Sequence, residues 1–183
     1  MHLAQLNVAR LLEPLDAPET AEFVAALEPV NALADAAAGF VWRLQADGGD
    51  ATSIRILDDD LVIVNMSVWE SLDALRAFVY RSDHKLVLRR KRAWFGPWGG
   101  PHLVLFWVPE GAPPTLDEAL ERLAQLTEEG PTAEAFDFKR PFAADGTPID
   151  LRRRGSGVAD VPGTQTDIAE SGVERDAAFD ALS

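Results

Sequence analysis

The sequence predicts an α+β fold in which one antiparallel sheet is combined with helices. Short apolar runs with strand-like alternation are interspersed with segments whose apolar residues recur at helical spacing. The chain has 183 residues, of which 47% are hydrophobic. A chain of this length and hydrophobic content can form the core of one globular domain, but it is too short for two.

The first part of the chain is predicted as a strand followed by a helix. Residues 2–10 form an apolar run that we interpret as a strand, although apolar content alone would also allow a helix. Asp16, Pro18 and Glu19 then follow in the order typical of a helix start, with Asp16 as the cap. Gly39 is expected to end this helix.

Two further strands and a helix are predicted in the middle of the chain. Residues 40–46 alternate as a strand does, and residues 61–69 give the clearest strand because they are rich in Val and Ile. Ser71 is placed to cap a helix that runs to about Tyr80.

The remaining elements are a helix, a strand and a last helix. A helical segment is expected over residues 82–95 and a strand over residues 103–108. Thr115 and Glu118 form a capping box, and Gly130 closes the helix that it opens. The first six elements therefore have the order of a ferredoxin-like split β-α-β unit, an antiparallel sheet with helices on one face.

The domain is expected to cover residues 1–142. From about Ala143 the chain contains almost no large apolar side chains and is rich in Gly, Ser, Thr, Pro and acidic residues. Such a segment cannot bury enough surface to offset its ordering entropy. Residues 143–183 are therefore predicted to form a disordered acidic tail.

Composition excludes several functional classes. The formal net charge of −13 argues against nucleic-acid binding, and the absence of cysteine excludes thiolate chemistry and disulfides. His2, His84 and His102 lack the spacing of metal ligands, so no metal is expected. No apolar run approaches the ~20 residues that span a bilayer. The N-terminus lacks the features of a signal peptide, and we expect a cytoplasmic protein.

Alternate residues of the predicted strands separate an apolar side from a mixed side. We expect the apolar sides to meet the helices. We expect the mixed sides to meet a second copy of the sheet, which would close a barrel with a polar and aromatic interior. The alternative is an open sheet with one face in water. The mixed sides supply the candidate ligand-binding residues, which are Asn7, Arg43, Asn65, Ser67, Trp69 and Trp107.

His84 lies on the apolar stripe of the helix predicted over residues 82–95. A histidine in this place can be held structurally by a carbonyl or a carboxylate. It can also transfer protons, because imidazole titrates at a pKa of about 6.5. His84 is therefore a candidate acid–base residue.

Several motifs resemble a known superfamily. Trp69-Glu-Ser71, Phe78 and Arg81-Ser-Asp-His84 resemble the strand-to-helix segment of the dimeric α/β-barrel superfamily, which includes antibiotic-biosynthesis monooxygenases. Within it, the chain closely resembles a bacterial family of unknown function, over roughly residues 2–142. The motifs that carry this second resemblance include Gly39-Phe-Val-Trp-Arg43, Asn65-Met-Ser-Val-Trp-Glu-Ser71 and Arg89-Arg-Lys-Arg-Ala-Trp-Phe95.

The resemblance implies a homodimer whose sheets pair into a barrel. Cofactor-free oxygenases of the superfamily use an interior Asn, Trp and His, and Asn7, Trp69 and His84 are of these types, with Asn7 and His84 as the catalytic candidates. Haem-degrading relatives carry a Trp where Phe78 stands here, and His84 lies about a turn before their haem ligand. No haem and no other cofactor is therefore expected.

Three functional hypotheses remain open from the sequence. The first is a cofactor-free monooxygenase or isomerase acting on a small aromatic or polyketide-like molecule. The second is a ligand-binding or sensor barrel that uses the same pocket without chemistry. The third is a structural dimer with a filled interior.

Overall fold

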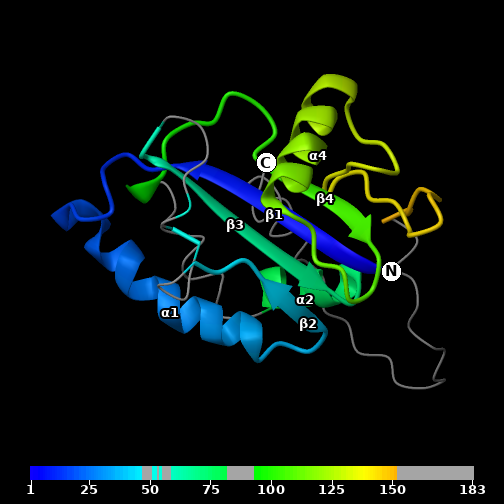
Figure 1. Ribbon diagram of the computed structural model, residues 1–183, viewed down its shortest axis with the longest axis horizontal. Helices are drawn as coiled ribbons and strands as arrows, with labels where there is room; N and C mark the ends of the chain where they lie inside the picture. Colours follow the sequence, from blue (N-terminus) through cyan, green and yellow to red (C-terminus); the bar gives the residue numbers. More distant parts are fainter. Residues whose placement is uncertain (47–50, 53, 55–58, 82–92, 152–183) are drawn as a thin grey trace, which may run out of the picture.

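The computed structural model describes residues 1–46, 51–52, 54, 59–81 and 93–151. These residues form a four-stranded sheet of order β2-β3-β1-β4, in which every neighbouring pair is antiparallel (Figure 1). This is the sheet of a ferredoxin-like split β-α-β unit. The predicted α+β class is confirmed.

The strands lie where strand-like alternation predicts them. β1 (His2–Arg10) is central and pairs with β3 (Val62–Trp69) on one side and with β4 (Leu103–Val108) on the other. The edge strand β2 (Phe40–Arg43) is shorter than predicted, and its register against β3 shifts at a bulge. The pairing extends one residue further, because the N–H of Leu44 donates to the β3 backbone at 2.9 Å.

The first helix begins later than the sequence suggests. A short 3-10 helix, η1 (Pro18–Thr20), precedes α1 (Ala21–Asp35), and no side chain caps either of them. The predicted cap at Asp16 is therefore wrong. The hydroxyl of Thr20 instead donates to the carbonyl of Pro14 at 2.6 Å and stabilises the turn from inside the loop.

The second helix begins at its predicted cap. In α2 (Leu72–Arg81) the first turn is closed by Ser71, whose hydroxyl accepts from the N–H of Ala74 at 3.1 Å. The helix predicted over residues 82–95, with His84 on its stripe, lies almost wholly outside the described residues.

The last helix, α4 (Leu116–Glu129), opens with the predicted capping box. The N–H of Glu118 donates to the Thr115 hydroxyl at 3.2 Å, and the N–H of Thr115 donates to the Glu118 carboxylate at 2.7 Å. Gly130 ends the helix with a positive φ of 75°.

Gly39 allows α1, β2 and α2 to approach one another closely. Its φ of +79° favours glycine, and an added Cβ would lie 2.6 Å from the Cβ of Ala74 in α2. The Gly39 carbonyl also accepts from the N–H of Glu70 at 2.8 Å. A side chain at this position would push α2 away from the sheet.

The two faces of the sheet are covered by different helices. The apolar face, with Leu6, Met66 and Phe106, packs against Leu123 and its neighbours in α4. The apolar sides therefore meet a helix, as predicted, but this helix is α4 and not α1 or α2. α1 and α2 lie over the opposite, mixed face (Figure 1).

The mixed face accepts helices because only part of it is polar. Leu3, Trp69 and Leu105 also point to this side, and they pack against Leu75 of α2 and against Phe136. These apolar residues anchor the helix layer at one end of the face. Because α1 and α2 occupy the mixed face, the prediction that a second sheet covers it is wrong. Association of two copies stays a prediction.

The chain makes regular contacts beyond residue 142. The N–H of Ala143 donates to the carbonyl of Thr147, and the N–H of Ile149 donates to that of Pro141, both at 2.8 Å. Residues 152–183, most of the predicted disordered tail, lie outside the described residues.

Candidate functional site

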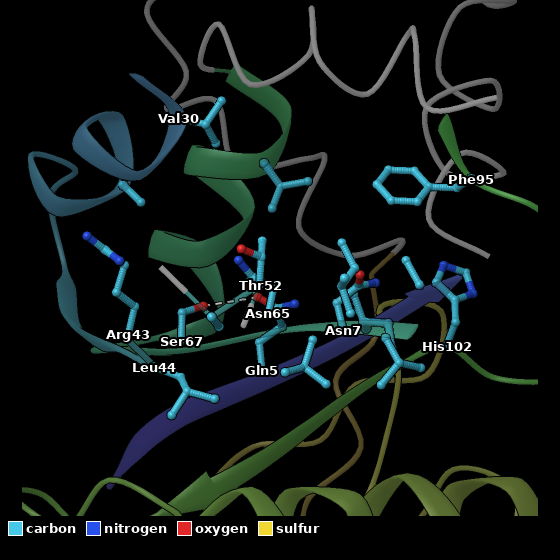
Figure 2. Close-up of a pocket in the computed structure, with 18 of the residues that line it drawn as sticks. Gln5, Asn7, Val30, Arg43, Leu44, Thr52, Asn65, Ser67, Phe95 and His102 are labelled. Atoms are coloured by element: carbon cyan, nitrogen blue, oxygen red, sulfur yellow. Dashed lines mark hydrogen bonds between the residues drawn. The ribbon is translucent and has the colours of Figure 1, made fainter. Parts of the chain in front are cut away.

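A cavity of about 500 Å³ lies between the mixed face of the sheet and the helices α1 and α2 (Figure 2). Its floor is formed by β1 and β3, and in Figure 2 the yellow-green ribbon of α4 lies on the far side of these strands. This volume is in the range of small-molecule sites.

Four polar side chains form the floor. Gln5 and Asn7 come from β1, and Asn65 and Ser67 from β3. The register pairs Asn7 with Asn65 and Gln5 with Ser67, so the four side chains lie in two adjacent rows on one side of the sheet. The strand period of two places them there, because their sequence neighbours point to α4.

The amides of Asn7 and Asn65 are available to a ligand. Within the described part of the chain, neither side chain makes a hydrogen bond. Asn65 is exposed, so the cavity opens to solvent at this residue. Each amide offers two N–H donors and a carbonyl acceptor to a molecule in the cavity.

Ser67 is held in a chain of hydrogen bonds. The buried indole Nε1 of Trp69 donates to Ser67 Oγ at 2.9 Å, and Ser67 Oγ donates to Gln5 Oε1 at 3.0 Å. Trp69 is 1% exposed, and its ring stacks on Phe78 of α2 with centroids 5.1 Å apart. The floor is thereby tied to the helix above it.

The roof of the cavity is mainly apolar, although Asn31 of α1 also lines it. α1 contributes Phe23, Leu27 and Val30, and α2 contributes Leu75 and Phe78. A ligand in the cavity would contact hydrocarbon and aromatic rings on one side and amides on the other. This combination suits a flat, mainly apolar molecule that carries a few polar atoms.

Arg43 forms one wall and is fixed by an ion pair. Its Nε donates to Asp35 Oδ1 at 2.8 Å, and its Nη2 donates to Asp35 Oδ2 at 3.2 Å. The Arg43 side chain is 13% exposed. The two-point contact joins the end of α1 to β2 and holds the guanidinium beside the cavity.

His102 also lines the cavity, although the sequence analysis did not select it. It directly precedes β4, and its carbonyl accepts from the N–H of Val8 at 2.8 Å. Figure 2 shows its ring rising from the same side of the sheet as Asn7. Strand alternation does not indicate His102, because this residue lies at the end of the loop that precedes β4.

The structure brings together most of the candidate residues. Trp107 is not among the described residues that line the cavity, because its Nε1 donates to the carbonyl of Phe142 at 2.9 Å. His84 lies outside the described residues. The candidates that do line the cavity are Asn7, Arg43, Asn65, Ser67 and Trp69.

The described lining of the cavity includes basic side chains but no acidic ones. Among its described lining residues there is no carboxylate, and the ionisable ones are Arg10, Arg43 and His102. Arg10 donates to Asp59 at 2.9 Å and thereby lowers the pKa of that carboxyl.

In the described ranges, no group of three His, Cys, Asp or Glu side chains is placed to hold a metal. No described helix has the length and apolar character needed to cross a membrane.

The fold and the cavity define a ferredoxin-like α+β protein with a small-molecule-sized site between its sheet and two helices. The chain belongs to the family called domain of unknown function DUF3291, whose model matches residues 2–151. The predicted membership of a family of unknown function is thus confirmed, whereas the superfamily stays a prediction. A comparison with curated proteins found no match.

Several solved structures share a similar chain trace. SnoaB, a cofactor-independent oxygenase from Streptomyces nogalater, is 20% identical, with 62% of this chain and 98% of that chain covered at a TM-score of 0.44. A mutant of SnoaB gives 22%, the same coverages and a TM-score of 0.43. PA3566 from Pseudomonas aeruginosa is 17% identical, with coverages of 61% and 95% and a TM-score of 0.36.

Proposed function

We propose that the cavity binds a small aromatic or polyketide-like molecule and that the protein acts on it as a cofactor-independent monooxygenase or isomerase. The observation that carries the proposal is the pairing of Asn7 with Asn65, two amides without protein partners in the described chain, below a mainly apolar roof. Such a site orients an oxygen-bearing ring system by its polar edge.

The amides suit chemistry in which negative charge develops on an oxygen. Removal of a proton from a carbon next to a carbonyl leaves an enolate, and N–H groups fixed on a rigid sheet stabilise its oxygen. In an isomerase the proton returns at another carbon. In a monooxygenase the carbanion transfers its electrons to O₂ and forms a C–O bond, which gives a hydroperoxide after protonation. Loss of water then breaks the O–O bond and the remaining C–H bond and leaves C=O, so one oxygen atom enters the product and the other leaves as water.

An imidazole is our proposed proton acceptor. His84 is the residue that the sequence nominates, and His102 is an imidazole that lines the cavity. Either His84→Asn or His102→Asn, whichever removes the proton acceptor, should lower turnover by about 10²–10⁴-fold, the usual contribution of general acid–base catalysis. Unchanged turnover in both variants would contradict proton transfer by an imidazole.

Anthrone is a suitable first probe because its CH₂ group is activated and its oxidation product is anthraquinone. We expect it to raise the melting temperature, and we expect one O₂ to be consumed per anthraquinone formed, as followed by oxygen electrode and mass spectrometry. The double variant Asn7→Ala with Asn65→Ala should lose turnover while staying folded. Absence of both stabilisation and product across anthrone and related aromatic ketones would contradict the proposal.

A ligand-binding or sensor role is the second candidate. The described lining holds no carboxylate, and both of its arginines pair with aspartates, so among its described ionisable groups only His102 suits proton transfer. Stabilisation by several aromatic ligands with no product would favour this role over catalysis.

A further inference from the structure

We propose that Gln5 is the specificity-determining residue of the cavity, and that the hydrogen-bond chain from Trp69 through Ser67 orients its amide as a donor to a carbonyl or enolate oxygen of the ligand. This inference rests on the proposed function, because it names a polar feature of the ligand which that function requires.

The direction of the hydrogen bonds in this chain follows from Trp69, which is its first member. An indole N–H only donates, so Trp69 Nε1 must give its hydrogen bond to Ser67 Oγ, at 2.9 Å. Ser67 is 7% exposed, and apart from Trp69 its side chain has one described partner, Gln5, at 3.0 Å. The hydroxyl proton is satisfied only if Ser67 donates to the oxygen of the Gln5 amide. The reverse amide orientation would leave that proton unpaired in a buried place.

The consequence is a fixed donor on the cavity floor. The two ends of an amide point apart, so an oxygen directed to Ser67 turns the NH₂ group of Gln5 away from it. Within the described part of the chain, Gln5 Nε2 makes no hydrogen bond, and Gln5 lines the cavity (Figure 2). The NH₂ group is therefore left to a ligand, which must offer an acceptor there.

The scaffold around the chain is rigid. Trp69 is 1% exposed and packs edge-on against Phe40 at 5.4 Å as well as flat against Phe78. Gln5 is paired in the sheet on both sides, with Ser67 in β3 and Leu105 in β4. A donor held in this way discriminates between ligands better than a freely rotating amide does.

Two ligands of matched shape test the inference. 9-Fluorenone carries one carbonyl, and fluorene has the same rings without it. The ratio of their dissociation constants reports the polar contact, because general damage to the cavity affects both ligands. The carbonyl stretching frequency of bound 9-fluorenone reports the hydrogen bond directly.

In the wild-type protein we expect 9-fluorenone to bind at least fivefold more tightly than fluorene, with a lowered stretching frequency. The substitution Gln5→Glu keeps an acceptor for Ser67 and replaces the donor by an acceptor, so the preference should disappear. Ser67→Ala releases the Gln5 amide, and the preference should fall by about threefold to fivefold, the range expected for one weakened hydrogen bond. Gln125→Glu in α4 makes the same chemical change on the other face and should have no effect.

The outcomes separate the two proposals. If both ligands bind but neither Gln5→Glu nor Ser67→Ala changes the preference or the stretching frequency, the role of Gln5 is overturned and the proposed cavity stands. If neither ligand binds the wild-type protein, both proposals fail. Ser67→Ala and the infrared measurement on wild-type protein keep the inference testable if Gln5→Glu does not fold.

Discussion

The two faces of one sheet differ in what fills them. On the face toward α4, Leu6, Met66 and Val104 are each at most 1% exposed and form a continuous core with the helix. On the face toward α1 and α2, the neighbouring positions Asn7 and Asn65 border a cavity. The same strands therefore build a packed core on one side and a cavity on the other.

The difference follows from side-chain chemistry at alternate positions. Apolar residues on that face pack in one core cluster with Ala119, Leu123 and Leu126 of α4. Amides have no matching apolar partner in a helix roof, and burying them without partners would be costly. The helices instead contact apolar residues on either side of the amides, Trp69 and Leu105 at one end of that face and Ile63 at the other. The alternation of side chains along each strand thus places the packed core on one face of the sheet and the cavity on the other.

The largest expected effect contrasts two consecutive residues of β1. Leu6→Ala removes a fully buried side chain from the packed face and should lower the free energy of unfolding by about 2–5 kcal/mol. Asn7→Ala, one residue further on, should change it by less than about 0.5 kcal/mol and should instead weaken 9-fluorenone binding. Urea unfolding and ligand titration of both variants test the contrast, which equal losses of stability would contradict.

Helix caps give a second comparison. Thr115→Ala removes the cap of α4 and Ser71→Ala removes that of α2, and each should cost about 1 kcal/mol of stability. Of these two helices, only α2 is among the described lining of the cavity. Ser71→Ala should therefore also weaken ligand binding, and Thr115→Ala should leave it unchanged when both are measured well below their melting temperatures.

The ion pair between Arg43 and Asp35 lies on the cavity side of the sheet. A double-mutant cycle with Arg43→Met and Asp35→Asn should give a coupling free energy of about 0.5–1 kcal/mol, since Asp35 is 44% exposed and solvent screens the pair. Arg43→Met should also alter ligand affinity, because the guanidinium lines the cavity. A coupling of zero in unfolding measurements would show that the pair does not fix this wall.

The smallest expected effect is a pH dependence on the packed side. Hydrogen bonds from the backbone N–H and the hydroxyl of Thr115 lower the pKa of Glu118 below its usual value. The carboxylate therefore adds stability above the pKa of the unfolded chain, and this contribution is lost as the pH falls through the folded pKa. Glu118→Gln should show a shallower loss of stability between pH 5 and 3 in urea unfolding. Identical pH profiles would contradict this assignment.

The sequence was sufficient for features that depend on local chemistry. The strands at His2–Arg10 and Leu103–Val108 and the capping box at Thr115 follow from alternation and from cap geometry, and the structure places all three as predicted. Alternation also selected Asn7 and Asn65, because residues that share a side of a strand can be read from their spacing.

Features that depend on tertiary packing could not be obtained in this way. The face that each helix covers depends on which apolar stripes meet, and Leu3 and Trp69 make the mixed face acceptable to helices as well. Trp107 shares its side with Gln5, yet it packs under Phe142, which lies 35 residues away in the chain. His102 enters the cavity from a loop that has no periodicity.

The central claim is that one chain builds the ligand site on its amide-bearing face. The most direct measurement is a titration with 9-fluorenone followed in ¹H–¹⁵N spectra through the side-chain NH₂ groups of Gln5, Asn7 and Asn65. The account predicts that these resonances shift in a saturable way, while the backbone amides of Leu123 and Leu126 in α4 stay in place. Shifts confined to the α4 face, or saturable binding that leaves all three NH₂ groups unchanged, would contradict it.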